Sequence, residues 1–285
     1  MARSRKSVDE LTAAALAAAA AAAAADPDAG TSRPDPSPAP GSRPAEDARP
    51  APDDGPWAVG FSGGLDSTVL LHALVRVAGA SRVLALHVDH GLQAASGAWA
   101  AHCEAVCARL GVRCLVLRAE GAPARGDSVE RWARTERYRL LRAAAREARA
   151  AALLTAHHAD DQLETVLLAL ARGSGLDGLT GIAARDVRHG VVLLRPLLAL
   201  DRAALEAAAR ARGLEWVEDP SNADPVFARN ALRARAMPAL REALPGLAAQ
   251  LPDALALLAQ ARGTLDALAQ ADLAGAVSAG SGPTG

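Results

Sequence analysis

Lysine is almost absent from this chain of 285 residues, because Lys6 is the only one. A Walker A loop needs a lysine on the outer phosphates of its nucleotide, and Schiff-base enzymes need a lysine nucleophile. The sequence therefore excludes both classes. A nucleotide site in this protein has to bind phosphate through backbone amides, hydroxyl groups, arginine or a metal ion.

Aromatic residues and cysteines are scarce too. Phe, Trp and Tyr make up 2% of the chain, and much of its 51% hydrophobic content is alanine, so the core must rest on leucine and valine. The three cysteines, Cys103, Cys107 and Cys114, match neither a CxxC motif nor a zinc pattern. We expect core cysteines in a reducing cytoplasm. No apolar run is long enough to cross a membrane.

Charge of one sign does not dominate, since 31 basic residues face 32 acidic ones. This balance excludes a uniformly basic nucleic-acid coat but allows a local basic face.

The composition changes along the chain and predicts four parts. Nine of the 17 prolines lie between Asp26 and Pro56, after an alanine-rich tract, so we expect residues 1–56 to form a disordered extension. Residues 57–237 hold the catalytic domain. A helical appendage at 238–273, the start of a truncated second domain, and a flexible tail at 274–285 complete the prediction.

Short apolar runs alternate with helix-like segments in the central part. This alternation predicts an α/β fold, a parallel sheet with helices on both faces. The expected strands are 57–61, 82–88, 113–117, 152–156 and 191–194, and the clearest helices are 67–77, 97–110 and 127–148. Ligands of such sheets bind beyond the carboxyl ends of the strands, so the polar residues there are the candidate site.

The first strand leads into Ser62-Gly63-Gly64-Leu65-Asp66-Ser67-Thr68. Two glycines allow backbone amides to approach an anion, the hydroxyl groups add donors, and the following helix adds its dipole. The segment predicts a phosphate cradle, and Asp66 beside phosphates suggests a magnesium ion between them. A tight strand-to-helix turn capped by Asp66 is the structural alternative.

Two other predicted strands also end in histidines and carboxylates. His87 and Asp89 follow the second strand, while His157, Asp160, Asp161 and Glu164 follow the fourth. Asp160 or Asp161 shares a helix face with Glu164, so the carboxylates could share a metal ion or a proton transfer. A helix cap with a solvated face and a di-metal phosphoesterase are the alternatives.

Arginines are concentrated in two later segments. The third long helix carries Arg134 and Arg137, and Arg229 and Arg233 follow a turn-rich acidic loop that starts at Glu218. Both segments suit phosphate binding. Taken alone, the first segment fits a solvated helix face better, and the alternative for the second is an interdomain turn with a surface helix.

Together these segments resemble the tRNA(Ile)-lysidine synthetases, a family of the N-type ATP pyrophosphatase or PP-loop superfamily. The resemblance covers about Trp57 to Arg235. It is carried by Ser62–Ser67, Val88–Leu92, Ala133-Arg134 with Arg137-Tyr138, Ala156–Gln162 with Glu164-Thr165, Arg195–Leu197, and Glu218–Asn222 with Arg229-Asn230.

The resemblance implies an adenine nucleotide α-hydrolase-like fold and a cytoplasmic ligase of tRNA modification that uses ATP and Mg²⁺. Such an enzyme adenylates the wobble cytidine of a tRNA(Ile) with a CAU anticodon and releases pyrophosphate. The amine of free lysine then displaces AMP to give lysidine. The oligomeric state stays open, with a homodimer as one option.

The resemblance also assigns roles to residues. ATP is expected at Ser62, Gly63, Gly64, Leu65, Asp66, Ser67, His87 and Asp89, the metal at Asp66 and Asp161, and catalysis at Asp66, His157, Asp160, Asp161 and Glu164. Contact with tRNA is expected at Arg134, Arg137, Glu218, Asp219, Asn222, Arg229, Asn230 and Arg233. A tRNA cytidine thiolase of the same superfamily and a catalytically silent tRNA-binding module remain alternatives.

Overall fold

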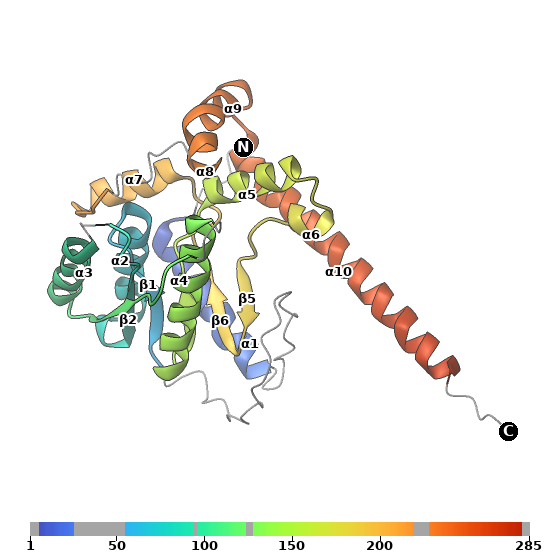
Figure 1. The fold of residues 1–285 in the computed structure, drawn as a ribbon, viewed down its shortest axis with the longest axis horizontal. Coiled ribbons are helices and arrows are strands. Elements are labelled where there is room, and N and C mark those ends of the chain that lie inside the picture. Colours follow the sequence, from blue (N-terminus) through green and yellow to red (C-terminus); the bar gives the residue numbers. More distant parts are fainter. Residues whose placement is uncertain (1–5, 26–54, 94–95, 124–127, 219–227, 281–285) are drawn as a thin grey trace. The chain divides into compact units, whose positions relative to one another are not determined.

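The computed structural model describes residues 6–25, 55–93, 96–123, 128–218 and 228–280. Contacts between Cα atoms divide the chain into two compact units. Unit 1 comprises Met1–His158 and Ala184–Asn222, and unit 2 comprises Ala159–Ala183 and Ala223–Gly285. The chain therefore leaves unit 1 after His158 and re-enters it at Ala184, so each unit is built from two separate segments (Figure 1).

Unit 1 is built on a six-stranded sheet with the order β3-β2-β1-β4-β6-β5. Its strands are β1 (Trp57–Gly60), β2 (Val83–Asp89), β3 (Arg113–Arg118), β4 (Ala152–Leu154), β5 (Arg185–Arg188) and β6 (Val191–Leu194). All neighbouring strands are parallel except β5 and β6. The predicted α/β fold with a largely parallel sheet is confirmed, and β5 is an edge strand that the sequence analysis did not include.

Helices cover both faces of this sheet because successive strand residues point to opposite sides. Val59 and Ala85 pack with residues of α2 (Leu65–Ala78), α3 (Ser96–Leu110) and α7 (Arg202–Ala211). The intervening residues Ala58 and Leu84 pack against α4 (Val129–Glu147) in a second cluster. A short 3-10 turn, η1 (Ala80–Arg82), joins α2 to β2.

The amino-terminal segment differs from the expected disorder, because Val8–Ala25 forms the helix α1. Val8, Thr12, Leu16 and Ala19 are buried on one stripe, and α1 contacts α2. Asp9 pairs with Arg76 at 3.0 Å and with Arg212 at 3.1 Å. The alanines give the helix propensity and the stripe gives it a docking face, whereas residues 26–54 of the predicted extension lie outside the described part.

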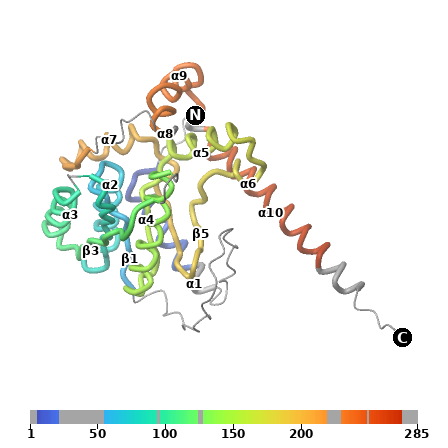
Figure 2. Tube along the Cα trace, viewed as in Figure 1, coloured from blue at the N-terminus to red at the C-terminus, as the bar shows by residue number. Residues whose placement is uncertain are grey.

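Unit 2 is helical in its described residues. It contains α5 (Ala159–Ala171), α6 (Leu176–Leu179), α8 (Ala228–Ala231), the π-helical turn η3 (Leu232–Ala236), α9 (Met237–Ala243) and α10 (Leu247–Gly280). Helix α10 contacts α5 and α6, so the helices after residue 237 group with α5 and do not stand as a separate appendage. Figure 2 follows this path along the chain.

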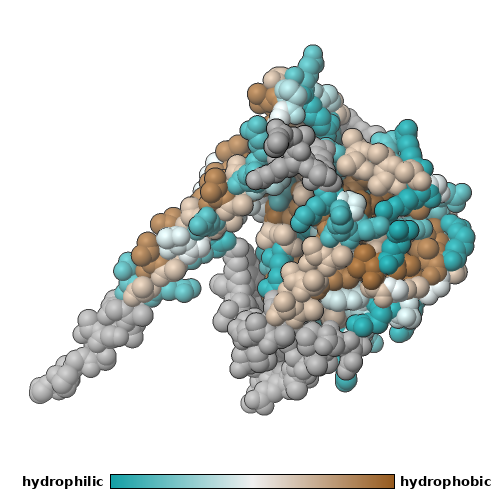
Figure 3. Space-filling view, turned by 180° about the vertical axis from the view of Figure 1, so that it is seen from behind, coloured by the Kyte–Doolittle hydropathy of each residue, from teal (hydrophilic) through white to brown (hydrophobic). Residues whose placement is uncertain are grey.

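The outer part of α10 carries apolar side chains that no other described element of unit 2 covers. Leu257, Leu265, Leu268 and Leu273 are all exposed, and Figure 3 shows apolar side chains along this helix. No described helix is both long enough and apolar enough to cross a bilayer.

Candidate functional site

The glycine-containing loop that follows β1 begins at Phe61 and ends where α2 starts at Leu65. Its backbone is fixed from both sides, since Phe61 N–H donates to Leu86 and Val217 N–H donates to the carbonyl of Gly63. The buried Leu65 anchors the first turn of α2. The loop therefore stands at the carboxyl end of β1 and opens onto the amino terminus of a helix, as the sequence predicts.

Three side-chain hydroxyl groups hold the loop in shape. Ser67 Oγ donates to the carbonyl of Gly64 at 3.0 Å and lies 3.0 Å from Ser62 Oγ. Ser62 N–H in turn points to Ser67 Oγ at 3.2 Å, and Thr68 Oγ1 donates to the carbonyl of Gly63. These bonds are internal to the loop, so Ser62 and Ser67 shape the cradle in addition to offering polar groups to a ligand.

Glycine occurs at these two positions of the loop for different structural reasons. Gly63 has a φ of +79°, and a Cβ there would lie 3.0 Å from Cys103 Sγ and 3.2 Å from Val217 Cγ2. Gly64 has an ordinary extended backbone at the N-cap of α2, and its nearest neighbour would be Ser62 Oγ at 3.5 Å. Gly63 is therefore required by the fold, whereas a side chain at Gly64 would meet only ordinary van der Waals contacts.

Asp66 lies in the first turn of α2 beside a histidine and an arginine. His158 Nε2 is 3.6 Å from its carboxylate and Arg202 Nη1 is 3.4 Å away. His158 is buried, while Arg202 at the start of α7 is half exposed. Asp66 is thus positioned beside the loop by these two contacts, and Arg202 is a candidate phosphate ligand that the sequence analysis did not identify.

His87 and Asp89 occupy the end of β2. The buried His87 places Nδ1 3.0 Å from the carbonyl of Phe61 and 3.3 Å from Cys103 Sγ. Asp89 accepts the N–H of Gly91 at 2.9 Å. His87 therefore supports the loop from within unit 1, and Asp89 shapes the turn that follows the strand.

The cysteines lie behind the loop as free thiols. Cys103 and Cys107 on α3 are buried, and burial raises the pKa of Cys103 to about 12. A thiol with that pKa stays protonated at neutral pH and is a poor nucleophile. The prediction of core cysteines is confirmed.

His157 follows β4 and lies between two hydroxyl groups. Its Nδ1 is 3.0 Å from Thr155 Oγ1, and its Nε2 is 3.4 Å from the hydroxyl of Tyr138 on α4. Neither hydroxyl was a site residue in the sequence analysis. Tyr138 was missed because it lies 19 residues before His157. No local sequence pattern links a helix residue to the residue after a strand that it contacts.

The three predicted carboxylates that follow β4 lie in unit 2, on α5, and each is paired with an arginine of the same unit. Glu164 accepts from Arg229 Nε at 2.8 Å and from Arg233. Arg233 also reaches Asp161 at 3.0 Å, and Arg241 on α9 reaches Asp160 at 2.7 Å. The sequence analysis separated these residues into catalytic acids and tRNA-binding arginines, but unit 2 brings them together as ion pairs.

The carboxylates of these ion pairs are buried, while most of their arginines keep contact with solvent. The side chain of Glu164 is 1% exposed and that of Arg229 is 20% exposed, whereas Arg233 retains 39% and Arg241 retains 51%. The π-helical turn η3 carries Arg233 between α8 and α9, and such turns often occur at functional sites. Each buried carboxylate therefore has a guanidinium within ion-pair distance to compensate its charge.

The remaining predicted tRNA contacts fall into three groups. Arg134, Arg137 and Glu218 are exposed in unit 1, and Asn230 is half buried on α8. Arg134 stacks over the ring of Tyr138 at 5.3 Å. Asp219 and Asn222 lie outside the described residues.

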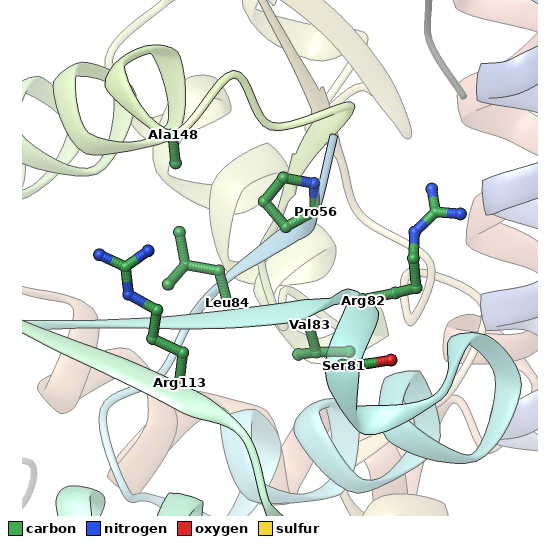
Figure 4. A pocket seen from close by; sticks show the side chains of 7 residues that line it. All are labelled: Pro56, Ser81, Arg82, Val83, Leu84, Arg113 and Ala148. Carbon is green, nitrogen blue, oxygen red and sulfur yellow. The ribbon is translucent and has the colours of Figure 1, made fainter. Parts of the chain in front are cut away.

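A hollow occurs at the opposite end of the sheet, where the strands begin (Figure 4). It is lined by Pro56, Ser81, Arg82, Val83, Leu84, Arg113 and Ala148. Ligands of parallel sheets bind at the carboxyl ends of the strands, so this hollow is not the candidate site. Within the described ranges, no group of three or more His, Cys, Asp or Glu side chains is arranged to hold a metal ion.

Comparison with known proteins places this loop in a family. The chain is 50% identical over 220 residues to the tRNA(Ile)-lysidine synthase of Pseudomonas fluorescens, which is 76% of this chain and 49% of that protein. It is 48% identical over 235 residues to the tRNA(Ile)-lysidine synthase of Pseudomonas aeruginosa, covering 81% and 52%. The chain thus spans about half the length of these curated relatives.

A solved structure supports the fold independently. The tRNA thiolase NcsA of Methanococcus maripaludis matches with a TM-score of 0.60 at 18% identity, over 72% of each chain. The profile of the PP-loop domain matches residues 45–240, which include every described element of the sheet and the loop after β1. The chain belongs to the PP-loop domain family.

Proposed function

We propose that this protein ligates lysine to the wobble cytidine of a tRNA(Ile) with a CAU anticodon, through an adenylated cytidine. ATP would lose pyrophosphate in the first step and lysine would displace AMP in the second. The observation that carries the proposal is the lysine-free loop Ser62–Ser67 in a chain that is about half identical to tRNA(Ile)-lysidine synthases over three quarters of its length.

The loop suits attack at the α-phosphate. In that reaction the β- and γ-phosphates leave together, so a site gains most by binding them as pyrophosphate. The amides of the first turn of α2 follow Gly64, and Arg202 lies beside Asp66. These groups would bind the leaving group through amide N–H donors, the helix dipole and one guanidinium.

Asp66 fits a magnesium ion bound mainly through substrate phosphates, because Mg²⁺ in such sites takes one or two carboxylates and keeps several waters. The ion would supply charge neutralisation on the phosphates. Both predicted ligands contact an arginine, but Asp161 is the more closely engaged, at 3.0 Å from Arg233 against 3.4 Å from Asp66 to Arg202, and the more buried. Of the two we therefore assign the ion first to Asp66.

We assign the lysine step to the strand-exit residues His157, Asp160, Asp161 and Glu164, as the sequence predicts. The amine of lysine is mostly protonated at neutral pH and must lose a proton before it attacks. The carboxylates of α5 suit a cationic substrate. Arg233 is the more exposed of the two arginines bound to Glu164 and would be the easier one for a lysine ammonium to replace.

The arginines of α4 are the better candidates for tRNA phosphates. Arg134 and Arg137 are exposed, whereas the charges of Arg229 and Arg233 are already compensated by Glu164. Each phosphate contact contributes about one unit to the slope of log affinity against log salt. Alanine at both positions of α4 should flatten that slope by about two units, and alanine at Arg229 and Arg233 by less.

The test is incorporation of labelled lysine into tRNA(Ile) transcripts with a CAU anticodon, with ATP present or omitted. Lysine incorporation with release of pyrophosphate and AMP supports the proposal, and release of ADP contradicts it. Labelled sulfur donor in a parallel reaction tests the thiolase alternative, which would need metal-binding cysteines that the described residues do not group together. We expect this protein in the cytoplasm, where such a reaction takes place. The oligomeric state of the protein is measured on the preparation used for the lysine assay.

A further inference from the structure

Tyr138 is surrounded by three guanidinium groups of unit 1. Arg134 and Arg142, four residues before and after it on α4, lie 5.3 and 5.2 Å from the centre of its ring. Arg195, which follows β6, hydrogen-bonds to Tyr138 through its side chain. Arg195 is 9% exposed, and burial is the main reason why its pKa is lowered.

The direction of each hydrogen bond follows from what each group can do. A guanidinium can only donate, so the oxygen of Tyr138 accepts from Arg195. Tyr138 has one proton of its own, and His157 Nε2 lies 3.4 Å from its hydroxyl. If Tyr138 donates that proton, Nε2 is the accepting nitrogen of the imidazole and carries no hydrogen.

The other imidazole nitrogen completes the chain. Nδ1 of His157 is 3.0 Å from Thr155 Oγ1, and a neutral imidazole that accepts at Nε2 donates at Nδ1.

We infer that Tyr138, oriented by Arg195, is a positioning residue that fixes His157 as the neutral tautomer with its proton on Nδ1. The same arrangement makes His157 unavailable as a base while Tyr138 stays in place, because the lone pair of Nε2 is already used. His157 therefore serves as a fixed polar group at the end of β4, and another group takes the proton of the incoming lysine. This last consequence rests on the proposed function, whereas the tautomer does not.

The tautomer is measured on the whole protein by nitrogen-15 NMR of histidine side chains at neutral pH. The chain has seven histidines, and His157→Asn identifies the signals of His157 by their loss. We expect Nδ1 to resonate as a protonated nitrogen and Nε2 as an unprotonated one. A protonated Nε2 in the unmodified protein, in either the other tautomer or the imidazolium, overturns the inference.

Two variants test the chain of donors. Tyr138→Phe removes the donor to Nε2, so the Nε2–H tautomer should become populated, and Arg195→Lys should produce a smaller shift in the same direction. Trp132→Phe on the same helix and Arg185→Lys on β5 are matched controls that should leave the signals of His157 unchanged. The other six imidazoles report a general loss of structure, and unchanged His157 signals in a folded Tyr138→Phe protein contradict the inference.

Activity gives a second readout. Tyr138→Phe should reduce kcat for lysine incorporation about five- to tenfold, as expected for the loss of one oriented hydrogen bond, and leave the KM for ATP unchanged. A raised KM with unchanged kcat would assign Tyr138 to ATP binding and refute the positioning role. If the unmodified protein incorporates no lysine, the proposed function fails while the NMR result still decides the tautomer.

Discussion

Gly63→Ala should destabilise unit 1 far more than the same change at the neighbouring Gly64. The φ of Gly63 is +79°, and a residue with a Cβ pays about 1–2 kcal/mol in this left-handed region. The new methyl would also lie 3.0 Å from Cys103 Sγ and 3.2 Å from His102 Cδ2. Overpacking of this kind costs about 1–3 kcal/mol, so we expect a total loss of about 2–5 kcal/mol.

Gly64→Ala is the matched control. The φ of −76° at Gly64 is open to any residue, and its Cβ would meet Ser62 Oγ only at 3.5 Å. We expect a change in unfolding free energy within about 0.5 kcal/mol. Gly64→Ala should nevertheless weaken ATP binding, because the added methyl would stand beside the amides that we propose as phosphate ligands.

Thermal and urea unfolding measure both variants, and calorimetric titration with ATP measures binding. For a domain of this size, 1 kcal/mol lowers Tm by about 2–4 °C, so Gly63→Ala should lower it by roughly 4–20 °C. Equal losses of stability in the two variants would refute the reasoning from φ and close contacts. Unchanged ATP binding in Gly64→Ala would refute the role of these amides.

Three further results are expected. Asp66→Asn should leave Tm within about 2 °C, since Asp66 is partly exposed, yet remove most ATP-dependent pyrophosphate release. Retained turnover would leave Asp66 only its ion pair with Arg202. Glu164→Gln should lower the free energy of unfolding of unit 2, measured with urea, by up to about 3 kcal/mol, because Arg229 and Arg233 lose a buried partner. A loss below about 0.5 kcal/mol would contradict this expectation. The control is Glu242→Gln, at an exposed position of α9. Burial lowers the pKa of both His72 and His90, so the folded state binds fewer protons than the unfolded state and stability should fall as pH drops below about 6.5; urea midpoints at pH 7.5 and 5.5 test this, and glutamine at both positions should flatten the difference.

The sequence identified those parts of the protein in which local chemistry and chain geometry coincide. The loop around Gly63 and Gly64 could be predicted because a strand, two glycines and the start of a helix follow one another directly in the sequence. The five expected strands and their parallel pairing are likewise found in the structure. Successive strand residues pack alternately into the two core clusters, as the period of two residues in a strand requires.

Contacts between distant residues could not be read from local patterns. Asp160 and Arg241 are 81 residues apart, and nothing in the spacing of either segment indicates the pairing. The helix α1 was missed because an alanine tract has little apolar surface, while its docking depends on Asp9 and on Arg212, which is 203 residues away. The edge strand β5 has the sequence Arg-Asp-Val-Arg, which offers too few apolar residues to predict a strand.

The ion pairs of unit 2 also set an order of events during synthesis. Glu164 leaves the ribosome 65 residues before Arg229, which at about 5–20 residues per second corresponds to roughly 3–13 s. During that interval the carboxylates of α5 have no arginine from the later segment and must stay hydrated. The strands β5 and β6 are made in the same interval, so the sheet of unit 1 can close before unit 2 acquires its buried charges. A nascent chain that stops before residue 229 would therefore carry a finished sheet and an α5 that is still exposed to water.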